Sequence, residues 1–187
     1  MSYRILIADD EPIIRTDLKE LLEELGYEVV AEAGDGLAAL NLIEQVQPDV
    51  VILDIKMPKM DGIQVAGEIA DRFPVIILTA YTERHLIEKA RDSGVMAYLS
   101  KPFREGDLSP GIELAVTHFL KTARLTEHVT RLKEQLEARK LIEKAKGLLM
   151  TREGLTEAQA YRKLQKTSMQ KNKSMRDVAD AVILMLE

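Results

Sequence analysis

The sequence predicts an α/β fold, a five-stranded doubly wound parallel sheet, followed by a long helix and a small three-helix all-α domain. Five short runs rich in β-branched residues alternate with stretches of helical period, and from about residue 105 onward only helical patterns occur. Residues 1–120 carry 11 Lys+Arg and 22 Asp+Glu, whereas residues 121–187 carry 15 and 9. We therefore expect an α/β domain over 1–120, a helical linker with a short coiled coil over 121–138, and the helical domain over 139–187.

Each expected strand is a short run of mostly aliphatic residues. The strands are expected at residues 4–8, 27–31, 50–53, 75–79 and 97–100. The runs at 50–53 and 75–78 contain aliphatic residues only, which is typical of central strands that are buried on both faces.

The stretches between the strands have the period of amphipathic helices. The first places Ile14, Leu18 and Leu22 on one face and ends before Gly26, a residue type that commonly follows a helix. The other helices are expected at residues 36–46, 62–72, 84–93 and from 106 onward. Such alternation requires right-handed crossovers, which place helices on both faces of a parallel sheet.

Polar side chains follow four of the five expected strands at their carboxyl ends. Because these ends meet at one edge of a parallel sheet, where ligands bind, we expect the side chains to converge there. Polar residues also follow strands simply because loops are solvated, but convergence from four strands favours a site. The residues are Asp9, Asp10 and Glu11 after the first strand, Asp54 after the third, Thr79 at the end of the fourth, and Lys101 after the fifth.

Clustered carboxylates repel one another unless a cation joins them, and Mg²⁺ prefers carboxylate oxygens together with water and phosphate oxygens. An aspartate can attack phosphorus and form an acyl phosphate, while Lys101 would supply a positive charge and Thr79 a hydroxyl donor. No glycine-rich phosphate loop occurs in the sequence. The pattern therefore indicates a protein that accepts a phosphoryl group from a phosphoprotein or a small phosphodonor.

These motifs together resemble the flavodoxin-like receiver domain of two-component response regulators. They are Asp9–Glu11, Val51–Pro58 with Asp61 and Gly62, Leu78–Ala80, and Lys101–Phe103, and the resemblance covers about residues 1–120. It implies phosphorylation of Asp54 by a sensor histidine kinase. It also implies a Mg²⁺ site formed by Asp10, Asp54 and the backbone carbonyl of Lys56, with Asp9 acting through water.

The same resemblance implies how the phosphoryl group is sensed. Thr79 would follow the phosphate, the aromatic side chain of Tyr98 would turn inward as part of the switch, and the Lys101–Pro102 peptide bond would be cis. The domain would promote only its own phosphorylation and dephosphorylation, so we do not expect an enzyme acting on other substrates.

The long helix carries a short apolar seam. Leu125, Val129, Leu132 and Leu136 follow one another at spacings of four, three and four, and the pattern stops at Arg139. Two interpretations remain open: an intermolecular coiled coil, and an amphipathic helix packed on its own domain. We favour the intermolecular seam, and with it a homodimer that forms on phosphorylation.

The last part of the chain predicts three helices with a small common core. From Arg139 the apolar face shifts to Leu141, Ile142, Ala145, Leu148 and Leu149, and Gly154 then ends the first of these helices. Thr156 and Gln159 then form a capping box that opens a helix over about 157–169. A turn at Asn172 follows, and Ser174 caps a final helix.

This region is strongly basic, as expected of a surface that binds nucleic acid. Between Arg139 and Arg176 there are eleven basic and three acidic residues. If the last two helices were a helix-turn-helix reading DNA, Asp177 and Asp180 on the final helix would be repelled by phosphates. The candidate nucleic-acid contacts are Arg139, Lys140, Lys144, Lys146, Arg162, Lys163, Lys166, Lys171, Lys173 and Arg176.

The segments Arg139–Met150, Gly154–Ala160 and Ser174–Ala179, in this order behind a receiver-like region, resemble the ANTAR domain of AmiR- and NasR-type antitermination regulators. The resemblance spans about residues 125–187. It implies binding of tandem stem-loops in nascent RNA, which prevents a terminator hairpin from forming.

The sequence thus favours a phosphorylation-controlled, RNA-binding antiterminator. The alternatives are a DNA-binding response regulator with a helix-turn-helix output and a receiver that acts through protein contacts alone. The absence of cysteine excludes disulfides, thiolate zinc sites and a cysteine nucleophile. Because the longest apolar runs have about six residues, far below the roughly 18 a membrane helix needs, we expect a cytoplasmic protein that does not enter a membrane.

Overall fold

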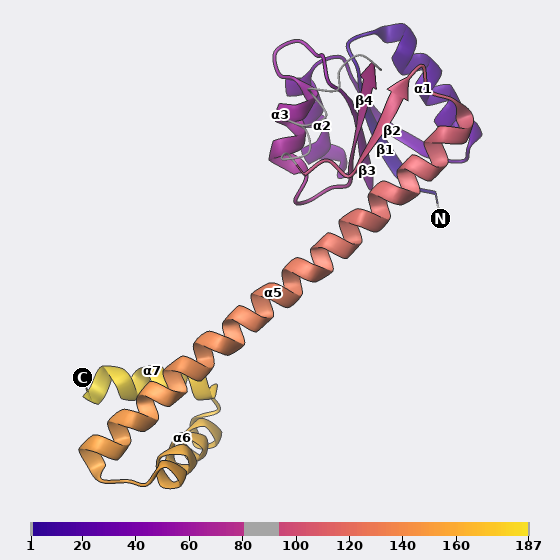
Figure 1. Ribbon diagram of the computed structural model, residues 1–187. Helices are drawn as coiled ribbons and strands as arrows, with labels where there is room; N and C mark the ends of the chain where they lie inside the picture. The colour runs from indigo at the N-terminus through magenta and orange to yellow at the C-terminus, as the bar shows by residue number, and fades with distance from the viewer. Residues whose placement is uncertain (1, 81–93, 187) are drawn as a thin grey trace. The chain divides into compact units, whose positions relative to one another are not determined.

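The computed structural model describes residues 2–80 and 94–186, and it confirms the α/β fold expected for the first part of the chain (Figure 1). The expected helix at 84–93 lies outside the described residues. Five parallel strands form one sheet in the order β2-β1-β3-β4-β5. Its elements are β1 (Arg4–Ala8), α1 (Pro12–Glu24), β2 (Glu28–Ala33), α2 (Gly36–Val46), β3 (Val50–Asp54), α3 (Gly62–Ile69), β4 (Val75–Ala80) and β5 (Ala97–Lys101).

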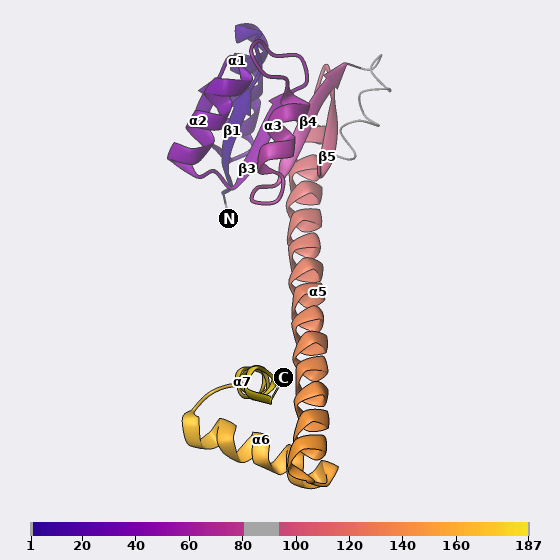
Figure 2. The same ribbon diagram turned by 90° about the vertical axis from the view of Figure 1, so that its left-hand side faces the viewer.

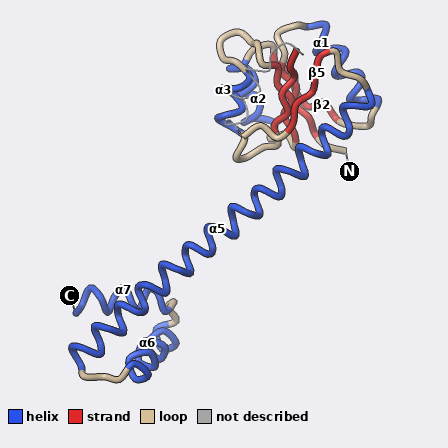
Figure 3. The backbone as a smooth tube through the Cα atoms, viewed as in Figure 1, coloured by secondary structure: helices blue, strands red, loops and turns tan. Residues whose placement is uncertain are grey.

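Helices cover both faces of the sheet, as the predicted crossovers require. On one face, α2 and α3 pack against β1, β3 and β4, with Ile43 and Ile69 fully buried. On the other face lie α1 and the first turns of α5 (Glu105–Glu153), which bury Leu18, Leu22 and Ile112. Figure 3 shows the strands in red between these two layers of helices.

The central strands have the burial predicted from their aliphatic composition. All five residues of β3 are buried, and the aliphatic residues Val75–Leu78 of β4 are fully buried. Asp54 ends β3 and is paired in register with Leu78, the residue before Thr79. The burial of these strands therefore fixes where their polar end residues lie.

Glycines and capping residues lie at the ends of several helices. Gly26 has a φ of 85° and follows α1, a conformation that favours glycine. Asp61 caps α3 and forms a capping box with Gln64. The helix ends at Ile69, earlier than the expected residue 72.

The second part of the chain is built from the end of α5 together with α6 (Glu157–Lys171) and α7 (Met175–Leu186). Helix α5 passes through Gly147 without interruption and ends before Gly154, which has a φ of 68°. The capping box of Thr156 and Gln159 is present at the start of α6, and Ser174 Oγ accepts a hydrogen bond from the Asp177 N–H.

These three helices enclose a small core of their own. Ala145 and Leu149 from α5 pack against Leu164 from α6 and against Ala179 and Ile183 from α7. Figure 2 shows α6 and α7 beside the last turns of α5. By the density of internal contacts the chain divides into two compact units, Met1–Ala123 and Arg124–Glu187. In the part of the chain that the structure describes, no helix has the length and apolarity needed to cross a membrane.

Candidate functional site

Three aspartates meet at the carboxyl end of the sheet. Asp9 and Asp10 directly follow β1, and Asp54 ends the neighbouring β3. One carboxylate oxygen from each lies within 4.8 Å of the others. Asp9 is fully buried and Asp54 is 7% exposed, whereas Asp10 is exposed to solvent. The cluster thus combines two buried carboxylates with one that faces water.

A single ammonium bridges the two buried carboxylates. Lys101 Nζ lies 2.6 Å from Asp9 Oδ2 and 2.6 Å from Asp54 Oδ1, and its side chain is 16% exposed. It comes from the end of β5, two strands away from β3. The peptide bond between Lys101 and Pro102 is cis, as the resemblance implied.

Burial and neighbouring charges shift the pKa values of this pair. Burial raises the pKa of Asp54, and the Asp9 carboxylate adds to the rise, while the Lys101 ammonium opposes it. For Lys101, burial is the largest influence and lowers the pKa, but the hydrogen bonds and charges of Asp54 and Asp9 outweigh it and raise the pKa. The site therefore stabilises the ammonium more fully than it stabilises the carboxylate of Asp54.

Backbone groups of the surrounding loops hold the carboxylates in place. The Lys56 N–H donates to Asp54 Oδ2 at 2.8 Å, and the Glu11 N–H donates to Asp9 Oδ1 at 2.9 Å. The loop after β3 folds closely over its own strand, because a Cβ on Gly62 would lie 2.0 Å from the carbonyl oxygen of Asp54. A side chain at residue 62 would push this loop away from the site.

Arg15 braces the other loop, a role that the sequence analysis missed. Its Nη1 donates to the backbone carbonyl of Asp9 at 2.6 Å. The arginine stands on the first turns of α1, six residues after Asp9, and nothing in the local sequence pattern marks it. Only the folded path of the loop brings its guanidinium to this carbonyl.

The donor set fits a hard divalent cation. Asp9 Oδ2 is buried, and the Lys101 ammonium at 2.6 Å is the contact that the structure shows for it. Carboxylate oxygens are the ligands that Mg²⁺ prefers, usually one or two of them with water. Asp10 and Asp54 offer two such groups with solvent on one side.

The residues expected to sense phosphorylation lie beside the cluster. Thr79 is 5% exposed, lies on β4 next to β3, and is paired in register with Ser100. Tyr98 on β5 is half-buried and packs against the core on the α2 and α3 face. Both residues therefore occupy strands that lead directly to the Lys101 end of the sheet.

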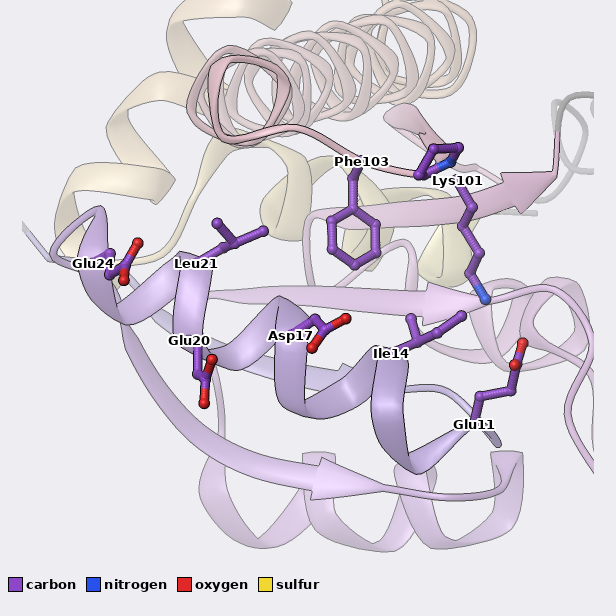
Figure 4. Close-up of a pocket in the computed structure, with 9 residues that line it drawn as sticks. Glu11, Ile14, Asp17, Glu20, Leu21, Glu24, Lys101 and Phe103 are labelled. Atoms are coloured by element: carbon purple, nitrogen blue, oxygen red, sulfur yellow. The ribbon is translucent and has the colours of Figure 1, made fainter.

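A pocket of about 690 Å³ opens next to Lys101, between α1 and the segment after β5 (Figure 4). Its apolar lining includes Ile14, Leu21 and Phe103. Its rim is acidic and is formed by Glu11, Asp17, Glu20 and Glu24. The carboxylate cluster thus adjoins a surface that combines apolar contact with negative charge.

The seam residues of α5 are all exposed within the second unit. The exposed fractions are 56% for Leu125, 50% for Val129, 63% for Leu132 and 54% for Leu136. None of them belongs to the three-helix core. The alternative of an amphipathic helix buried on its own domain therefore has no support from these side chains.

One of the expected nucleic-acid contacts has a structural role instead. Lys146 is 6% exposed, and its Nζ lies 3.0 Å from a Glu143 oxygen and 2.7 Å from Glu157 Oε1. It joins the end of α5 to the first turn of α6. Helical spacing could have revealed this, because residue 146 lies on the same arc as the buried Leu149 and the half-buried Ile142.

The other expected contacts lie on the surface. Lys140 forms an ion pair with Glu137, and Lys163 forms one with Glu153. Arg139, Lys144, Arg162, Lys166, Lys171, Lys173 and Arg176 are exposed as well.

Comparison with known families and proteins places both parts of the chain. Residues 5–113 match the response regulator receiver domain, and residues 130–183 match the ANTAR domain. The transcriptional regulatory protein PdtaR of Mycobacterium tuberculosis is 51% identical over 182 residues, which are 96% of this chain and 89% of PdtaR. The sporulation initiation phosphotransferase F of Bacillus subtilis is 39% identical over 106 residues, covering 55% of this chain and 85% of that protein.

Solved structures resemble the first unit. A DNA-binding response regulator of the LuxR family from Staphylococcus aureus is 35% identical with a TM-score of 0.58, covering 61% of this chain and 98% of that chain. A chain of the CheX–CheY–BeF₃–Mg²⁺ complex from Borrelia burgdorferi is 26% identical with a TM-score of 0.56, covering 59% of this chain and 86% of that chain.

The charge of the cluster leads to a first prediction, on stability. Because the pKa of Asp54 is raised in the folded state, the stability gained from its protonation is present at low pH and is lost as pH rises through the folded pKa. At pH 7 without divalent cations, Asp54→Asn should therefore increase the free energy of urea unfolding. Mg²⁺ should stabilise the native protein and should stabilise the variant much less.

The exposed Asp71 provides the control. Asp71→Asn removes the same charge outside the cluster, so its stability should respond to Mg²⁺ as the native protein does. Equal stabilisation of native protein and Asp54→Asn by Mg²⁺ would contradict the assignment of Asp54 to the cation site.

Proposed function

Because the chain belongs to the two-component response regulators that join a receiver domain to an ANTAR domain, we propose that phosphorylation of Asp54 controls its binding to RNA. In this proposal a sensor histidine kinase supplies the phosphoryl group. The phosphorylated protein dimerises through the α5 seam, binds tandem stem-loops in nascent transcripts, and causes antitermination.

The observation that carries the phosphorylation step is the pairing of buried Asp54 with Lys101 inside a cluster of carboxylates. A carboxylate oxygen of Asp54 attacks phosphorus, and the bond from phosphorus to the donor breaks. The electron pair of that bond leaves with the imidazole nitrogen of a phosphohistidine or with the acetate oxygen of acetyl phosphate. The product is an acyl phosphate on Asp54.

The neighbouring groups stabilise the charge that the phosphoryl group brings. Asp10, Asp54 and the carbonyl of Lys56 would hold Mg²⁺, with Asp9 acting through water, and the ion would neutralise phosphoryl oxygens. Lys101, already beside Asp54, supplies a positive charge to the same oxygens. Thr79, on the adjacent strand, supplies a hydroxyl donor.

The pocket beside Lys101 suits the approach of a protein donor. Its apolar lining and acidic rim match a helix that carries apolar and basic side chains. Small phosphodonors do not need this surface. Substitutions on the rim should therefore change the rate of phosphorylation by the kinase but not the rate of phosphorylation by acetyl phosphate.

The ANTAR domain and the charge of the second unit support RNA as the target. The 51% identical relative is named a transcriptional regulatory protein, which fits an effect on transcription. A DNA-reading final helix is disfavoured, because the outer side of α7 exposes Asp177 and Asp180.

The α5 seam supports a dimer that is weak until phosphorylation strengthens it. Four exposed apolar side chains spaced at four and three residues are the pattern of a coiled-coil contact. The positions flanking this seam carry no acidic residue. They are occupied by Lys121, Thr126, His128, Lys133, Gln135 and Lys140. In a parallel dimer, His128 would face Lys133 of the second copy, so no flanking ion pair would add to the apolar contact.

Phosphorylation adds roughly −1.5 to −2 units of charge next to Lys101 and Thr79. To affect the second unit, this charge would bias a two-state element, for which Tyr98 and the Lys101 end of β5 are the candidates. Two RNA-binding units in one dimer would then bind two hairpins at high effective concentration.

The second prediction tests the acceptor. Asp54→Asn keeps the shape of the side chain but removes the nucleophile, so labelling by acetyl phosphate and Mg²⁺ should vanish. The readout is the mass of the intact protein together with the inorganic phosphate that hydroxylamine releases from an acyl phosphate. Stoichiometric acyl phosphate in this variant would contradict the assignment.

Two further variants make this result specific. Asp71→Asn should be labelled like the native protein by either donor. Glu20→Lys reverses a charge on the pocket rim away from the nucleophile, so it should lower labelling by the kinase while leaving labelling by acetyl phosphate unchanged.

The third prediction tests the seam. Leu132→Glu places a charge in the apolar contact, so the phosphorylated protein should remain monomeric in sedimentation. Its affinity for a two-hairpin RNA should fall by about 10², while its affinity for a single hairpin should change little. Leu184→Glu, a matched change at a residue that is 77% exposed on α7, should leave the dimer intact. A phosphorylated Leu132→Glu protein that is dimeric and binds RNA normally would rule out the seam as the switch.

A further inference from the structure

Helix α6 separates its residues into a buried face and an outer face. Ala160 and Leu164 are buried in the core of the second unit. The residues that follow them around the helix point to solvent. They recur at spacings of three and four residues and so share one side of the helix. This α6 outer face consists of Tyr161, Arg162, Gln165, Lys166 and Met169.

Tyr161 is an exposed aromatic residue that does not belong to the core of the second unit. Its side chain is 44% exposed, and the three-helix core is complete without it. In the described part of the chain, its ring stacks on no other aromatic ring and lies under no cation, and its hydroxyl has no hydrogen-bond partner. Exposed aromatic rings in RNA-binding proteins stack on unpaired bases.

The polar groups on the α6 outer face are also available. Among the described residues, Arg162 and Lys166 form no ion pair and Gln165 has no hydrogen-bond partner. By contrast, the neighbouring Lys163 is paired with Glu153 on α5. Arg162 directly follows Tyr161 in the sequence, and Lys166 directly follows Gln165. Backbone phosphates and the base attached to them can therefore be bound by the same face.

We infer that the α6 outer face reads single-stranded bases of an RNA loop, with Tyr161 stacking on one base while Arg162 and Lys166 bind the flanking phosphates. Gln165, one turn after Tyr161, is placed to form hydrogen bonds with a base edge. Met169, one turn after Gln165, adds an apolar side chain to the same face and is 72% exposed. This inference rests on the proposed RNA-binding function and names the helix and the ligand class through which it acts.

The competing surface on α7 lacks these properties. Its exposed residues combine Asp177 and Asp180 with the apolar Leu184 and Met185, which are 77% and 83% exposed. Carboxylates repel the phosphate backbone, and aliphatic side chains offer no ring for a base to stack on. The chemistry of base recognition therefore lies on α6.

The test uses the full chain, phosphorylated with acetyl phosphate, and a two-hairpin RNA recovered by binding selection from transcribed genomic fragments. Unpaired loop purines of this RNA are replaced one at a time by 2-aminopurine, whose fluorescence reports stacking. Binding of the native protein should change the fluorescence at one loop position. Tyr161→Phe should preserve this change, whereas Tyr161→Leu, which keeps apolar bulk but removes the ring, should abolish it.

Affinities give the second readout. Tyr161→Leu should weaken RNA binding by roughly five- to hundredfold with an unchanged salt dependence, because stacking releases no counterions. Arg162→Gln should weaken binding and also flatten the salt dependence. Thermal unfolding of each variant checks that the second unit is folded.

The outcomes separate this inference from the function on which it rests. If the native protein binds the selected RNA but Tyr161→Leu binds equally well, or if no loop position responds in the native protein, the role of Tyr161 is refuted while RNA binding stands. If selection recovers no RNA that the native protein binds, the proposed function itself fails.

Discussion

In the described part of the chain, the half-buried ammonium of Lys101 faces a cluster of three carboxylates, and the first unit is organised around this arrangement. Lys101 comes from β5 and bridges Asp9 after β1 to Asp54 at the end of β3, so it ties together strands far apart in the sequence. A single positive charge cannot compensate three negative ones. The site is therefore suited to a divalent cation, and once the cation is bound it is suited to a phosphoryl group.

In the second unit, too, one lysine forms internal ion pairs with carboxylates. Basic residues dominate there, yet the fold uses Lys146 internally to join α5 to α6 and leaves other basic residues exposed on the surface. In the proposed dimer, the basic and neutral residues that flank the apolar seam of α5 would keep the association of two copies weak. A modest free-energy change on phosphorylation of Asp54 could then control this weak contact.

Much of the fold and of the candidate site could be predicted because short, local sequence patterns determine it. Aliphatic runs located the central strands, and the polar residues that end them located Asp54 and Thr79. The capping box of Thr156 and Gln159 located the start of α6. The contacts that sequence reasoning missed depend on tertiary proximity: Arg15 reaches the Asp9 carbonyl only through the path of the loop, and Lys146 was interpreted by its charge although its helical position faces the core.

The most direct test of the coupling between the two units compares dissociation constants for RNAs with one and two hairpins before and after phosphorylation of the full chain. Phosphorylation should raise the affinity for the two-hairpin RNA by roughly 10² and leave the one-hairpin affinity nearly unchanged, because only a dimer can bind both hairpins at once. An equal gain for both RNAs, or no gain for either, would contradict control through dimerisation.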